Sequence, residues 1–130
     1  MTRKLDPRKA VGYVQKAENS LMMARVGLQK GAYDNAVMSS VHSAINALDG
    51  LTTAYIGKRS SGEHSDVLSL LKGTLTQGEH EVISRQFSTL LGMKNESEYQ
   101  PTLMSQKDAE NAVKWAERIL NTVKSKLKPD

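Results

Sequence analysis

The chain has 130 residues, with 18 basic and 14 acidic side chains and a formal net charge of +4. It has no cysteine, which excludes disulfides and thiolate metal sites and suits a reducing compartment. No apolar run approaches the roughly 20 residues of a membrane span, and the N-terminus lacks the pattern of a secretory signal. We therefore expect one domain over residues 1–130, cytoplasmic and not bound to a membrane.

The basic residues are spread along the chain, with a modest excess at its two ends. Arg3, Lys4, Arg8 and Lys9 open the sequence, and three lysines close it, at positions 124, 126 and 128. Nucleic-acid-binding proteins usually concentrate positive charge on one face. We interpret these residues mainly as solvated helix ends, although the balance also permits a phosphate-bearing partner.

The first half of the sequence predicts two long helices. Asp6 is the expected N-cap of the first, with Pro7 at its first helical position and Gly31 as its C-cap. Asp34 is the expected cap of the second, which ends near Gly57. Apolar residues recur along that helix, with small residues between them, which is typical of a helix packed on more than one side. These apolar residues are Val37, Val41, Ala44, Ile45, Leu48, Leu51 and Tyr55. We predict that this helix is the central one.

The second half predicts two or three further helices. Ser60 and Glu63, and then Thr76 and Glu79, have capping-box spacing before a short apolar helix and a longer one that breaks around Gly92. Residues 93–104 contain Pro101 and are irregular, and Ser105 is the expected cap of the last helix. No segment alternates as a strand does. The sequence thus predicts an all-α, antiparallel up-and-down bundle of four to five helices.

Three polar residues of the central helix are candidates for a binding site. His42, Asn46 and Asp49 share one helical face, so an imidazole, an amide and a carboxylate would line one groove. One interpretation is a polar strip that faces a ligand or a second subunit. The other is a core histidine satisfied by a neighbouring helix.

Arg59 and His64 form a second candidate site in the segment that follows. An arginine that holds a phosphate and a histidine that acts as acid or base would together suit RNA cleavage. The alternative is a solvated loop arginine and a histidine that caps the next helix. His80 has the pattern of an exposed helix start and nothing more, and Trp115 that of a core-edge residue. The histidines lack metal-site spacing, so we expect no metal and no cofactor.

Three short motifs in this order resemble the HEPN domain family of small helical-bundle proteins. Residues 41–48, Val-His-Ser-Ala-Ile-Asn-Ala-Leu, resemble its central-helix signature. Residues 63–71, which begin Glu-His-Ser-Asp-Val, are similar to its Thr-His-x-x-Val segment. Residues 94–101, Lys-Asn-Glu-Ser-Glu-Tyr-Gln-Pro, are similar to the stretch before its last helix. The resemblance covers nearly the whole chain.

This resemblance implies a bundle of about five helices that commonly forms homodimers, often as the partner of a minimal nucleotidyltransferase in a toxin–antitoxin-like context. It also implies a nucleotide or RNA ligand. One branch consists of metal-independent ribonucleases with Arg-x(4–6)-His, a spacing that Arg59 and His64 fit. That branch usually has Asn, Asp or His after the arginine, where this chain has Ser60. Our leading hypothesis is therefore a non-catalytic binding protein that uses His42, Asn46, Asp49, Arg59 and His64, and the alternative is a ribonuclease.

Overall fold

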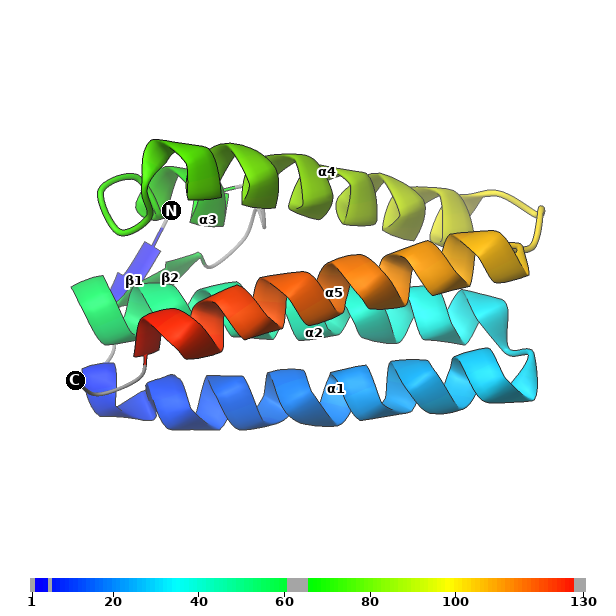
Figure 1. Cartoon of the computed structure of the whole chain (residues 1–130), viewed down its shortest axis with the longest axis horizontal. Coiled ribbons are helices and arrows are strands. Elements are labelled where there is room, and N and C mark those ends of the chain that lie inside the picture. The colour runs from blue at the N-terminus through cyan, green and yellow to red at the C-terminus, as the bar shows by residue number, and fades with distance from the viewer. Residues whose placement is uncertain (1, 5, 61–65, 128–130) are drawn as a thin grey trace.

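The computed structural model describes residues 2–4, 6–60 and 66–127. Within these residues the chain forms five α-helices: α1 (Ala10–Lys30), α2 (Tyr33–Ile56), α3 (Asp66–Leu70), α4 (Gln77–Tyr99) and α5 (Gln106–Leu127). The four long helices lie side by side and alternate in direction (Figure 1). The predicted all-α up-and-down bundle is therefore confirmed. Because residues 61–65 are outside the described part, the capping box predicted at Ser60 and Glu63 is outside it too.

Helix α2 is the centre of the bundle, as its apolar pattern predicted. It packs against α1, α4 and α5, and its side chains contribute more buried residues than those of any other described helix. Phe87 of α4 and Ile119 of α5 are completely buried in the same core as Leu48 and Leu51 of α2. Trp115 is half-buried at the edge of that core, as expected.

Small residues bring α1 and α2 unusually close together. A β-carbon on Gly27 would lie 3.1 Å from the backbone nitrogen of Ala36, and one on Gly50 would lie 3.3 Å from the Cβ of Tyr13. The buried Ser43 hydroxyl donates a hydrogen bond of 2.8 Å to the carbonyl of residue 17 across the same interface. The spacing of small residues in α2 thus reflects direct backbone packing.

Two of the predicted helix ends are confirmed and two predicted starts are wrong. Gly31 and Gly57 end α1 and α2 in the left-handed conformation, with φ of 78° and 65°. Asp6 caps a short 3-10 helix, η1 (Pro7–Lys9), through its carboxylate and the Arg8 N–H, so α1 begins later than expected. Asp34 lies inside the first turn of α2 and caps nothing, because its carboxylate is held by Ser97 of α4 and by Met104 in the loop before α5.

The ends of α4 and the start of α5 follow local rules, with one exception. The capping box of Thr76 and Glu79 is confirmed, and Ser105 forms a reciprocal pair with Asp108 at the start of α5. The predicted break near Gly92 is wrong, since α4 continues to Tyr99. Burial of neighbouring leucines outweighs the modest helix penalty of one glycine. The helix ends before Pro101, which disfavours helical backbone in the preceding residue.

A small antiparallel ribbon corrects the prediction that no segment forms a strand. Strand β1 (Thr2–Lys4) pairs with strand β2 (Lys58–Ser60) beside the C-terminal half of α2 (Figure 1). Arg3 pairs with Arg59, and Lys4 with Lys58. Strands of three residues are too short to show the alternation that identifies a strand in sequence.

Candidate functional site

The polar residues predicted on α2 do share one face, and this face runs from solvent into the interior. His42 is exposed and Asn46 is half-buried, with its amide donating a hydrogen bond of 2.9 Å to the His42 carbonyl. Asp49 is only 6% exposed. The interpretation of His42 as a core histidine is therefore wrong. The strip meets solvent through His42 and Asn46.

The inner end of this strip is in the C-terminal half of α2, the helix against which β2 packs. Thr52 and Thr53 are buried there with Asp49, and the Thr52 hydroxyl donates a hydrogen bond of 3.2 Å to the Asp49 carbonyl. Small polar side chains are thus buried together with leucines in the C-terminal half of α2.

The Arg59–His64 pair is only partly within the described residues. Arg59 is the middle residue of β2, opposite Arg3 of β1. Its side chain and the whole of His64 lie outside what the structure describes. The predicted catalytic pair therefore stays a prediction.

His80 has a structural role that its sequence context did not indicate. Its Nε2 lies 2.8 Å from the carbonyl oxygen of Leu68, and its Nδ1 lies 3.3 Å from the Ser84 hydroxyl. A carbonyl can only accept, so Nε2 carries a proton, and in the neutral imidazole Nδ1 accepts from the Ser84 hydroxyl. The prediction of an exposed helix start is wrong, because this half-buried imidazole joins α4 to α3.

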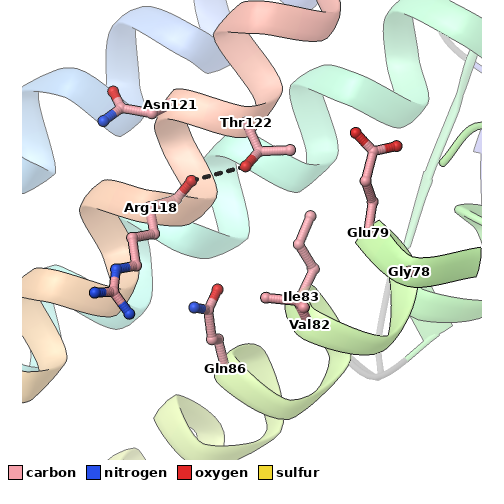
Figure 2. Close-up of a pocket in the computed structure, with 8 residues that line it drawn as sticks. All are labelled: Gly78, Glu79, Val82, Ile83, Gln86, Arg118, Asn121 and Thr122. Carbon is pink, nitrogen blue, oxygen red and sulfur yellow. Dashed lines mark hydrogen bonds between the residues drawn. The ribbon is translucent and has the colours of Figure 1, made fainter. Parts of the chain in front are cut away.

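A groove lies between α4 and α5, and none of its lining residues is a predicted site residue. It has a volume of about 530 Å³, within the range of small-molecule sites. Figure 2 shows Val82 and Ile83 between the two helices, with Gln86 and Arg118 towards one end and Glu79 towards the other. The sequence did not reveal it, because its lining comes from two helices that each show an ordinary polar flank.

Glu79, which lines this groove, forms an ion pair with the end of α5. Lys126 Nζ lies 2.7 Å from Glu79 Oε1. The ammonium of Lys126, together with the Thr76 N–H, lowers the pKa of the Glu79 carboxyl below its usual value. Glu79 thus links the start of α4 to the end of α5 and is already occupied by these two partners.

The described residues lack two features that would indicate other kinds of function. Among them, no three side chains of His, Cys, Asp or Glu come together as metal ligands do. No helix among the described residues has the length and apolar character needed to cross a membrane.

An antiparallel bundle around one central helix, with a polar face on that helix, defines a class of small helical-bundle proteins. A family model described as "HEPN domain" matches residues 10–126, and the chain belongs to this family. The crystal structure of TT1696 from Thermus thermophilus is 25% identical, with a TM-score of 0.75, and the match covers 92% of this chain and 98% of that one.

A second solved structure points to the same family. ST0689, described as an archaeal HEPN homologue, is 26% identical with a TM-score of 0.71 and the same coverage of 92% and 98%. No curated protein matches the chain. The resemblance found in three short motifs is therefore confirmed by the family match and by both structures.

Proposed function

We propose that this chain is a non-catalytic HEPN protein that binds a nucleotide or nucleic acid through the open face of α2. The observation that carries this proposal is the exposure of His42 and the partial exposure of Asn46 on a helix that is otherwise largely buried. An imidazole and an amide present hydrogen-bond donors and acceptors that bases and phosphates can use. Arg59 lies in the strand that packs against the same helix and would add a positive charge.

We further propose that the chain forms a homodimer, as the family resemblance implies. Exposed apolar side chains on α1 supply surface for such contacts: Met22 is 55% exposed and Met23 is 54% exposed. Methionine is common at protein interfaces. Sedimentation equilibrium at micromolar concentration should give twice the chain mass of 14.3 kDa, and a single-chain mass would remove this part of the proposal.

The binding proposal is tested by titrating ATP and a labelled single-stranded RNA into the wild type and three variants. His42→Ala and Asn46→Ala should each weaken binding by about fivefold or more, the equivalent of one hydrogen bond. Asn95→Ala, which changes an exposed amide on α4, is the matched control and should bind as the wild type does. If the wild type binds neither ATP nor RNA, the remaining candidate partner for this face is a minimal nucleotidyltransferase.

The ribonuclease remains the alternative function, because Arg59 and His64 fit the spacing of that branch. Incubating labelled single-stranded RNA with wild type, Arg59→Ala and His64→Ala in the presence of EDTA separates the two. Our proposal expects no cleavage, or equal cleavage by all three proteins through contamination. Cleavage by the wild type that both variants lose would establish the ribonuclease.

A further inference from the structure

The ribbon gathers positive charge that is dispersed in the sequence. Four of the six residues in β1 and β2 are basic and none is acidic: Arg3, Lys4, Lys58 and Arg59. The register sets Arg3 opposite Arg59 and Lys4 opposite Lys58. Like charges at directly opposed positions destabilise an antiparallel pair. An anion that contacts both strands would relieve this repulsion.

A second basic feature lies at the same end of the bundle. The end of η1 and the first turns of α1 form a hollow of about 310 Å³, lined by Lys9, Gly12, Tyr13 and Lys16. Both lysine side chains are exposed, and neither ammonium group forms a salt bridge with a residue that the structure describes, although the charge of Lys9 acts on the Asp6 carboxylate. The half-buried Tyr13 lies between them along the helix.

The hollow and the ribbon are placed together by α2. Tyr13 contacts α2 at Gly50, where a β-carbon would lie 3.3 Å from its Cβ, and η1 and β2 both pack against α2. Figure 1 shows the ribbon and the start of α1 at one end of the bundle. The turn that carries Lys9, the helix that carries Lys16 and the strand that carries Lys58 and Arg59 therefore all pack against α2.

Positive charge that flanks an aromatic ring is the arrangement with which proteins hold single-stranded nucleic acid. The cations follow the backbone phosphates and the ring stacks on a base, whatever the sequence. The bases of a duplex are stacked inside it, so the phosphates of a duplex would contact the lysines but no base would stack on the Tyr13 ring. An acidic protein would also use the lysines alone.

We propose that the β1–β2 ribbon and the hollow of Lys9, Tyr13 and Lys16 bind the phosphodiester backbone of single-stranded nucleic acid, with one base stacked on Tyr13. This inference rests on the proposed function, because it names the class of ligand that the face of α2 would bind and adds a second binding site for the same ligand. None of Lys9, Tyr13 and Lys16 belongs to the site that the sequence predicted.

The test is fluorescence anisotropy with a labelled oligouridylate of about 12 nucleotides, measured over a range of salt concentrations. Three double variants each remove two positive charges: Lys58→Gln with Arg59→Gln in the ribbon, Lys9→Gln with Lys16→Gln in the hollow, and Lys107→Gln with Lys114→Gln as the control. The control residues are exposed on α5, away from the ribbon. Circular dichroism checks that each variant is folded.

Ribbon and hollow variants should each lose about tenfold or more in affinity. The slope of log affinity against log salt should fall by about 1.4 for each pair, because a single strand contributes about 0.7 per phosphate contact. The control pair should stay within about twofold of wild type. Tyr13→Leu should lose about fivefold or more, since stacking is removed, and Tyr13→Phe should retain binding.

Any of five outcomes would overturn the proposal. Equal loss in the control pair would mean that only the overall charge matters. Duplex RNA bound as tightly as the single strand, or polyglutamate that competes as well as the oligouridylate, would remove the single-stranded ligand. If His42→Ala weakens binding but the ribbon and hollow variants do not, this inference alone is wrong. If the wild type binds no nucleic acid, the nucleic-acid part of the proposed function is wrong as well.

Discussion

The carboxylate of Asp34, in the first turn of α2, accepts a hydrogen bond of 2.6 Å from the backbone N–H of Met104. Its other oxygen accepts one of 3.1 Å from the hydroxyl of Ser97 near the end of α4. One side chain thus holds the segment between α4 and α5 against the central helix. This segment contains Pro101 and has no helix of its own, so its position depends on such contacts.

Replacing Asp34 should therefore destabilise the fold. Asp34→Ala leaves the Met104 N–H without its acceptor, which costs about 1–3 kcal/mol when the group is at least partly buried. Urea denaturation should show a lower midpoint with an unchanged slope. The exposed neighbour is the control, and Asn35→Ala should change the unfolding free energy by less than about 0.5 kcal/mol. Equal stability of Asp34→Ala and wild type would contradict this role.

Two glycines in helices should respond to alanine in opposite ways. A β-carbon on Gly27 would lie 3.1 Å from the backbone nitrogen of Ala36 and 3.2 Å from the carbonyl oxygen of Ala32. Backbone atoms cannot yield as a side chain can, so Gly27→Ala should destabilise the protein by about 1–3 kcal/mol. At Gly92 a β-carbon meets nothing within 4 Å, so Gly92→Ala should stabilise it by about 0.5–1 kcal/mol.

Thermal unfolding of these two variants checks the pair. The melting temperature should fall for Gly27→Ala and rise for Gly92→Ala. A rise in both would mean that α1 and α2 adjust to the added methyl group. A fall at Gly92 would mean that α4 is not continuous through this residue.

The Glu79–Lys126 ion pair predicts a dependence of stability on pH. Because the partners lower the pKa of Glu79 in the folded state, its contribution is present above the ordinary pKa of 4.5 and is lost as pH falls through the lower folded value. Glu79→Gln should reduce the unfolding free energy at pH 7 by less than about 1 kcal/mol, since both side chains are partly exposed.

The difference between Glu79→Gln and wild type should therefore disappear as the solution is acidified below pH 4.5. Glutamine can still serve in the capping box with Thr76, so the variant isolates the charge. Denaturant titrations at several pH values measure the difference, with Glu81→Gln on the exposed side of α4 as control. A constant difference across the acid range would rule out the ion pair as its cause.

The imidazole of His80 should control how readily α3 opens. This helix has only five residues, and the Leu68 carbonyl in it accepts from His80 Nε2 over 2.8 Å. Losing about 1 kcal/mol of local stabilisation in His80→Ala should speed amide exchange in α3 by about fivefold. Ser84→Ala leaves that bond intact and should have a smaller effect. Hydrogen exchange read by mass spectrometry tests both, and unchanged exchange in His80→Ala would contradict the link.

Much of the helical framework was predictable because its signals are local. Gly31 and Gly57 each end a helix in the left-handed conformation, which glycine adopts without a steric penalty. The capping box of Thr76 and Glu79 depends on residues only three positions apart. Gly92 misled the prediction because a weak helix former was read as a break, whereas the buried leucines beside it decide the outcome.

The candidate site was predictable only in part. The shared face of His42, Asn46 and Asp49 follows from helical periodicity. Their gradient of exposure does not, because it depends on which other elements pack over each part of α2. The role of His80 was missed for a similar reason, since its partner carbonyl belongs to another helix.

By itself, the sequence determined which segments are helices, where most of them end, which helix is central and to which family the chain belongs, because periodicity, caps and short motifs act over a few residues. Only the tertiary structure decided the pairing of Arg3 with Arg59, the contact of Asp34 with Met104 and the groove between α4 and α5. Each of these joins residues far apart in the chain. Their contact depends on how the whole bundle packs, and a local sequence pattern does not encode that packing.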